Sequence, residues 1–123
     1  MRYLMLLKAT APTTPPPPEL MEAIARLGEE ATKAGALLDF AGLAPSDAGA
    51  RLELTSGDLI VSDGPFTEAR EVVSYAVYDV RSKEEAVAWG TRFLEAHRDH
   101  WPEWEGTTDL LKLFGPEDMP PSS

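Results

Sequence analysis

The chain has 123 residues, 43% of them hydrophobic, which suits one domain with a single core and argues against a second. It contains no cysteine, which excludes disulfides, thiolate catalysis and cysteine-based metal sites and favours a reducing, cytoplasmic location. The formal net charge of −10 disfavours nucleic acids and anionic membranes as partners. We expect one domain over residues 1–114 and a flexible tail over residues 115–123.

The first part of the chain predicts a strand, a proline-rich connector and a helix. Residues 3–7 form a short apolar run, typical of a central strand and too short for a membrane span. Residues 15–18 are four prolines, which favour a polyproline II connector that leads into the first turn of a helix. Over residues 19–34 apolar side chains recur every three or four positions, and Gly35 then provides a helix end.

The remaining strands are expected at residues 36–40, 51–54, 59–62, 72–80 and 107–114. Ser56 and Gly57 predict a tight hairpin between the third and fourth strands. Residues 72–80 form the longest β-branched and aromatic stretch, so we expect this strand in the middle of the sheet. Ser82 with Glu85 is a capping-box pattern that begins a second helix, which we expect to run to about Asp99.

This order of elements predicts an α+β fold. A β-α-β unit, a small hairpin and a second β-α-β unit make the split βαβ arrangement of ferredoxin-like domains, with an antiparallel sheet and two helices on one face. The other face of the sheet also carries apolar side chains, which water would contact in a monomer. We therefore expect a homodimer that packs sheet to sheet.

One segment resembles a known family. Residues 61–71 contain Asp63-Gly64-Pro65-Phe66, and this string resembles the hallmark of the DGPF group within the YCII-related (YciI-like) family. Segments like residues 2–7, 97–102 and 104–106 extend the resemblance over nearly the whole chain. From the residues alone, the same tetrapeptide reads as a turn.

The resemblance implies a dimeric α+β barrel built from ferredoxin-like protomers, in a family mostly without established function and partly associated with extracytoplasmic-function sigma factors. Some YciI-like relatives are proposed to act through a His and Asp pair, with the histidine in the first helix. Residues 19–34 contain no histidine, so that pair does not carry over to this chain. Asp99 is a rough counterpart of the acidic partner only.

The candidate catalytic residues are His97, His100, Asp63 and Asp99. The two histidines continue the three- and four-residue spacing of the second helix, so we expect both on or beside its sheet-facing side. One interpretation makes either imidazole a general acid or base oriented by a carboxylate. The alternative is a pair of structural histidines that pack near Trp101 and cap carbonyl groups.

Candidate ligand-binding residues are Phe66, Glu68, Arg70 and Trp101, although ion pairs and core packing would explain them equally well. A metal held by the two histidines and a carboxylate such as Glu71 is a weaker alternative, and we expect no metal. The chain has no glycine-rich phosphate loop and no nucleophile elbow, so we expect no cofactor.

Two function classes remain open. The first is a dimeric small-molecule-binding or regulatory module, which the acidic surface and the scarcity of nucleophiles favour. The second is a cofactor-independent lyase or isomerase that acts on a small, possibly aromatic substrate through a His and Asp pair. The sequence does not choose between them.

Overall fold

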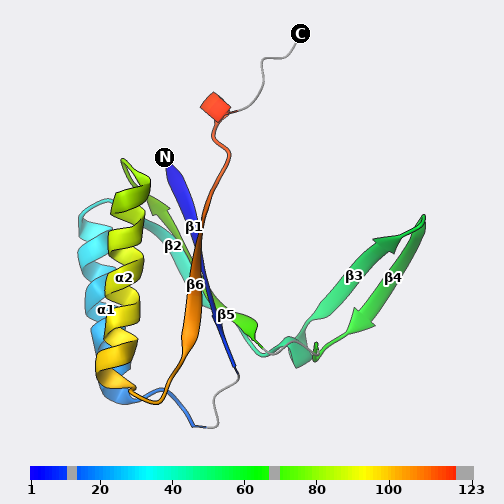
Figure 1. Cartoon of the computed structure of the whole chain (residues 1–123), viewed down its shortest axis with the longest axis horizontal. Coiled ribbons are helices and arrows are strands. Elements are labelled where there is room, and N and C mark those ends of the chain that lie inside the picture. The colour runs from blue at the N-terminus through cyan, green and yellow to red at the C-terminus, as the bar shows by residue number, and fades with distance from the viewer. Residues whose placement is uncertain (11–13, 67–69, 119–123) are drawn as a thin grey trace.

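The computed structural model describes residues 1–10, 14–66 and 70–118. Its elements follow in the order β1 (Arg2–Ala9), α1 (Pro18–Lys33), β2 (Leu37–Gly42), the 3-10 helix η1 (Ser46–Ala48), β3 (Ala50–Thr55), β4 (Asp58–Asp63), β5 (Glu71–Asp79), α2 (Lys83–His100), β6 (Gly106–Lys112) and the 3-10 helix η2 (Pro116–Asp118). In Figure 1 the two helices lie side by side on one side of the main sheet, and the β3–β4 hairpin projects on the other side.

The main sheet has the strand order β2-β5-β1-β6, and every neighbouring pair in it is antiparallel. Each helix therefore connects two parallel strands that are separated by another strand, which is the split βαβ topology. This confirms the predicted α+β, ferredoxin-like arrangement and the interior position of β5.

Helix α1 begins and ends where its proline and glycine residues require. Pro17 has the extended dihedrals φ −60° and ψ 145°, and Pro18 occupies the first turn, where a missing N–H breaks no helical hydrogen bond. Gly35 has φ +74°, a conformation that side chains with a Cβ disfavour. The N–H of Ala36 then donates to the carbonyl of Ala31 at 2.9 Å, which closes the helix end.

Helix α2 begins at its predicted cap. The hydroxyl of Ser82 accepts a hydrogen bond from the N–H of Glu85 at 3.1 Å. The Glu85 carboxylate accepts from the N–H of Arg81 and not from that of Ser82, so the reciprocal half of the capping box is displaced by one residue.

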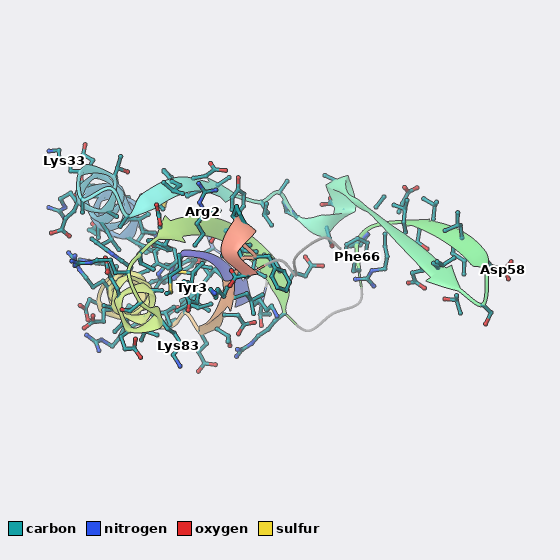
Figure 2. The ribbon with its side chains drawn as sticks, turned by 90° about the horizontal axis from the view of Figure 1, so that it is seen from above. Arg2, Tyr3, Lys33, Asp58, Phe66 and Lys83 are labelled. Carbon is teal, nitrogen blue, oxygen red and sulfur yellow. The ribbon has the colours of Figure 1, made fainter. Side chains whose placement is uncertain are left out.

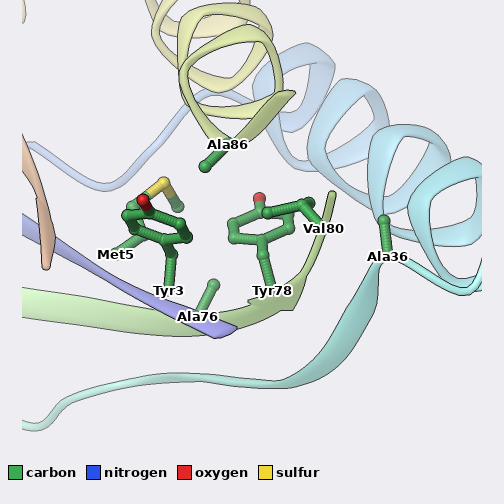
Figure 3. Close-up of a cluster of buried hydrophobic side chains, with 7 residues drawn as sticks. All are labelled: Tyr3, Met5, Ala36, Ala76, Tyr78, Val80 and Ala86. Carbon is green, nitrogen blue, oxygen red and sulfur yellow. The ribbon is translucent and has the colours of Figure 1, made fainter. Parts of the chain in front are cut away.

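The core lies between the helices and the sheet (Figure 3). Its buried side chains are Tyr3, Met5, Ala36, Ala76, Tyr78, Val80 and Ala86. They come from alternate positions of β1 and of β5 with the residue after it, from the residue before β2 and from the inner side of α2. Tyr78 stacks on Trp89 of α2 with the ring centroids 6.4 Å apart. The small residues Ala86 and Gly90 on α2 are both buried and let this helix approach the sheet closely.

We call the opposite side of the sheet the open face, and over residues 1–10, 14–66 and 70–118 it carries no helix (Figure 1). At its centre Leu4, Leu6 and Val77 are half-buried, and Leu111 is 50% exposed. Lys8 and Asp109 form an ion pair at 3.0 Å beside them. An apolar centre with a charged rim is typical of a surface that packs on a partner.

Strands β3 and β4 form a separate two-stranded sheet, which we call the arm, and are not paired with the main sheet. Ser56 and Gly57 connect them with φ values of +51° and +83°, as expected for the predicted tight turn. In Figure 2 the tip of the arm at Asp58 lies far from the helices, while Phe66 lies at its base.

The C-terminal segment is partly held in place. β6 ends at Lys112, two residues before the predicted end, and the carboxylate of Asp118 accepts hydrogen bonds from the N–H of Gly115 and from Lys112, both at 3.0 Å. The first residues of the expected flexible tail are therefore tied to the end of the last strand.

Candidate functional site

The DGPF segment fixes the base of the arm. The N–H of Gly64 donates to the carbonyl of Gly49 at 3.0 Å, and the N–H of Phe66 donates to the hydroxyl of Ser46 at 3.0 Å. The Ser46 hydroxyl in turn donates to the carboxylate of Glu71 at the start of β5. One serine thus links the turn, the loop before the arm and the main sheet.

Gly64 has no room for a side chain. A Cβ at this position would lie 1.6 Å from the carbonyl oxygen of Ser46, a backbone atom that cannot rotate away. Above Phe66, the guanidinium of Arg51 lies 4.2 Å from the ring centroid, a cation–π contact. In the described residues the motif therefore orients the arm, which agrees with reading it as a turn.

A mostly apolar cavity of about 380 Å³ lies on the helical side of the sheet. Its walls come from the inner side of α1, from β1, β2 and β5, and from the end of α2 with the loop after it. Aromatic side chains form much of the lining: Phe40, Tyr78, Phe93, Trp101 and Trp104. Its volume falls within the range of small-molecule sites, roughly 300–1,000 Å³.

Among the described residues, His97 is the buried residue with a polar or charged side chain, and it lines this cavity. It is only 5% exposed. Its Nδ1 lies 2.9 Å from the carbonyl oxygen of Phe93, and because a carbonyl only accepts, Nδ1 carries the proton. Burial lowers the pKa of His97 below its ordinary value of 6.5, against a smaller opposing effect of the Phe93 hydrogen bond.

These observations define one available atom. In a neutral ring protonated on Nδ1, Nε2 has a lone pair and accepts hydrogen bonds. Within the described ranges Nε2 has no hydrogen-bond partner. No fully buried side-chain nitrogen or oxygen there lacks a partner, so Nε2 must keep some accessible surface. It is thus the atom of His97 that remains to accept a hydrogen bond from a molecule in the cavity.

The ring of His97 is held by two aromatic neighbours. Phe93 meets it edge-on with the centroids 4.7 Å apart, and Trp104 lies against it at 4.4 Å. Trp104 is placed by Gly106, whose missing side chain leaves room for the indole ring. The N–H of Trp101 donates to the carbonyl of His97 at 2.8 Å and closes helix α2 above the cavity.

The lowered pKa of His97 predicts an acid-dependent loss of stability. Between pH 6.5 and the folded pKa, the unfolded chain binds more protons at this ring than the folded chain does. The free energy of unfolding should therefore keep this contribution above about pH 6.5 and lose it as the pH falls through the folded pKa. We expect His97→Gln to remove this dependence and His100→Gln to retain it, as measured by urea unfolding from about pH 5 to about pH 8. The same pH slope in His97→Gln as in the unmodified chain would contradict the assignment.

The structure does not bring the other candidate catalytic residues to His97. His100 is exposed, so the prediction that it lies on the sheet-facing side is wrong. Asp99 is also exposed and pairs with Arg98 at 3.0 Å. Asp63 is exposed at the end of β4, opposite Ala50. Among the described residues no carboxylate forms a hydrogen bond or ion pair with His97.

The candidate ligand-binding residues are also separated. Trp101 lines the cavity. Phe66 lies at the base of the arm, and Arg70 donates to the hydroxyl of Thr107 at 2.8 Å. Glu68 lies outside the described residues.

Within residues 1–10, 14–66 and 70–118, no group of three His, Asp or Glu side chains is arranged to hold a metal ion. Neither helix in these ranges combines the length and apolar character needed to cross a membrane.

Sequence reasoning missed the contribution of α1 to the cavity. Leu20, Met21 and Ile24 form its wall on that helix, and the spacing of the apolar residues predicted only that this side faces the sheet. Phe93 was not among the predicted site residues, although its carbonyl fixes the tautomer of His97.

The topology and the cavity together define a ferredoxin-like α+β domain with a ligand-sized space on its helical side. The family model of the YCII-related domain matches residues 1–102. The chain therefore belongs to the YCII-related family, as the DGPF segment indicated. A search of curated proteins finds no match.

Proposed function

We propose that this YCII-related protein is a homodimer in which each chain binds a small, uncharged, largely apolar molecule in the cavity beside His97. The observation that carries the proposal is the buried, neutral imidazole whose Nε2 is free to accept a hydrogen bond within an aromatic lining. A ligand that fits would combine a flat apolar body with one O–H or N–H donor.

Charge supports an uncharged ligand. The chain has a net charge of −10, which repels anions at a distance. The cavity wall is mainly hydrocarbon and aromatic, so an ion entering it would lose its hydration without a matching charge. The absence of cysteine from the sequence supports a cytoplasmic location for this function.

The dimer part of the proposal rests on the open face. Leu4, Leu6, Val77 and Leu111 form an apolar strip across three strands, and no helix among the described residues covers it. A second copy placed face to face would bury the strip of both chains and form a closed two-sheet core, the dimeric barrel expected for the family.

The lyase or isomerase alternative would use the same lone pair of His97 as a base. It also needs a group that orients the ring as charge develops, and here a backbone carbonyl occupies Nδ1. Asp63 and Asp99 both lie exposed, away from this ring. Binding without chemistry is therefore the function that the geometry supports best.

The test uses three probes of similar shape in calorimetric titrations. We expect 2-naphthol, which has an O–H donor, to bind one per chain with a Kd on the order of 10–100 µM. Loss of the donor in 2-methoxynaphthalene should weaken binding by about 5- to 10-fold. The anion 2-naphthoate should bind more weakly still.

The variant His97→Phe assigns the donor preference to the imidazole. It keeps an aromatic ring in the wall but removes the acceptor, so 2-naphthol and 2-methoxynaphthalene should bind about equally, whereas His100→Gln should preserve the preference. Absence of 2-naphthol binding to the unmodified chain, or an unchanged preference in a folded His97→Phe variant, would contradict the proposal.

A further inference from the structure

One side of the arm is strongly apolar and is left exposed by the part of the chain that the structure describes. In an antiparallel pair, directly opposed residues point to the same side, so Leu52 with Val61 and Leu54 with Leu59 form one side of the arm. These four side chains are 73%, 68%, 71% and 78% exposed. The other side carries Arg51, Glu53 and Ser62 with Ile60.

A bare hairpin of this kind is not stable by itself in water. Beyond their mutual pairing, β3 and β4 make only slight contact with the other elements, and the hydrogen bonds of Ser46 and Gly64 hold only the base. The sequence nevertheless alternates apolar and polar residues along β3, and Leu59 and Val61 of β4 stand opposite its two leucines, which is the pattern of a strand pair with one buried side. The arm is therefore built to be covered.

The surface of the chain is large enough to include such an interface. Its accessible area is 8684 Å², whereas a compact monomer of 13.4 kDa is expected to expose about 6,500 Å². The four bare side chains of the arm and the strip of the open face belong to this surface, and a standard interface takes only roughly 800 Å² from each partner.

The arm also has the reach and the direction to contact a second copy. Strands of six residues extend about 20 Å, and a four-stranded sheet is about 15–20 Å wide, so the arm can span a partner's sheet. In Figure 1 it projects on the same side as the open face and away from its own helices. One symmetric partner can thus cover both apolar surfaces at once, twice per dimer.

We propose that the apolar side of the arm, formed by Leu52, Leu54, Leu59 and Val61, packs on a second copy of this chain beside the open face of the partner's sheet. This inference rests on the proposed homodimer and adds to it a second contact region. The DGPF turn then has a definite task, because it sets the angle at which the arm leaves the domain.

The first test weakens the arm contact without unfolding the hairpin. The double variant Leu52→Thr with Leu59→Thr keeps high strand propensity but removes two apolar side chains. We expect the dimer Kd in sedimentation equilibrium to rise by about 10- to 100-fold. The matched control Glu53→Thr with Ser62→Thr changes the polar side of the same strands and should stay within about 2-fold.

A second measurement locates the arm directly. Because the chain has no cysteine, Leu59→Cys can carry a single benzophenone maleimide. In a mixture with ¹⁵N-labelled chain we expect crosslinks between chains, attached to an edge strand, β2 or β6, of the partner's main sheet. The same label on Glu84→Cys, exposed at the start of α2, should give few crosslinks between chains.

The outcomes separate the arm from the dimer. Suppose that the unmodified chain dimerises and that the Leu52→Thr, Leu59→Thr variant has the same dimer Kd, or that the arm label crosslinks only within its own chain. Either result would overturn the arm contact and leave the sheet-to-sheet dimer unaffected. A chain that remains monomeric at high micromolar concentration would overturn both proposals.

Discussion

Leu6→Asp is expected to convert the homodimer into monomers that remain folded. Leu6 lies in β1 at the centre of the open face, between Tyr75 of β5 and Asp109 of β6. In the proposed dimer a carboxylate here would be buried against the partner's apolar strip and would stand beside Asp109, which has the same charge. In the monomer the position is only half-buried, so the new carboxylate keeps contact with water.

We expect the dimer Kd of Leu6→Asp to rise by more than about 100-fold, with circular dichroism unchanged, since a buried unpaired charge costs several kcal/mol. Val87→Asp is the matched control. It makes the same charge change at a side chain 46% exposed on α2, outside the open face, and should leave the Kd within about 2-fold. An undisturbed dimer in Leu6→Asp would show that the open face is not the interface.

Gly106→Ala is expected to lower both stability and cavity binding. A Cβ at Gly106 would lie 2.2 and 2.4 Å from two ring atoms of Trp104 and 2.9 Å from the carbonyl oxygen of Lys8. The Lys8 carbonyl belongs to the pairing of β1 with β6 and has little freedom, so the indole ring must move. The indole ring packs on the imidazole of His97 with the ring centroids 4.4 Å apart. Displacement of the indole would therefore open the cavity wall beside His97.

The expected loss in free energy of unfolding is about 1–3 kcal/mol, typical of overpacking at a tight site, with a weakening of 2-naphthol binding by about 10-fold. Gly28→Ala is a control that should raise the free energy of unfolding instead of lowering it. A Cβ there meets no atom within 4 Å, and alanine is favoured over glycine inside a helix by about 0.5–1 kcal/mol. Equal urea midpoints for Gly106→Ala and the unmodified chain would show that Trp104 is not fixed by the glycine.

Local signals were sufficient to predict the topology. The helix ends lie where residues typical of helix ends predicted them: Pro18 at the start of α1, Gly35 after its end and Ser82 before α2. The run of β-branched and aromatic residues in β5 lies in the sheet interior, as its composition indicated. These features depend on neighbouring residues only, which is why one sequence reveals them.

The two histidines show where a spacing argument loses accuracy. At 100° per residue, the seven residues from Gly90 to His97 return the side chain to within about 20° of the same direction, and His97 is buried. The ten residues to His100 leave it about 80° away, and it is exposed. Residues spaced three or four apart lie on one side of a helix only when the two spacings average about 3.6 residues.

The cavity and the separate position of the arm could not be predicted from the sequence, and the reason is physical. The spacing in α1 fixes which side of the helix meets the sheet, but not how far the helix stands from Phe40 and Tyr78. Ser56 and Gly57 predict the hairpin of β3 and β4, but not whether its apolar side meets its own sheet or another chain. Both features depend on long-range packing.

The most direct test of the account is long-range ¹H–¹⁵N NMR of His97 at pH 7, with and without 2-naphthol. We predict a neutral ring protonated on Nδ1, whose Nε2 resonance shifts on addition of the probe, with nuclear Overhauser contacts from the naphthyl protons to Phe93 and Trp104. A ring protonated on Nε2 or on both nitrogens, or an Nε2 resonance that does not move while 2-naphthol binds, would contradict the proposed site.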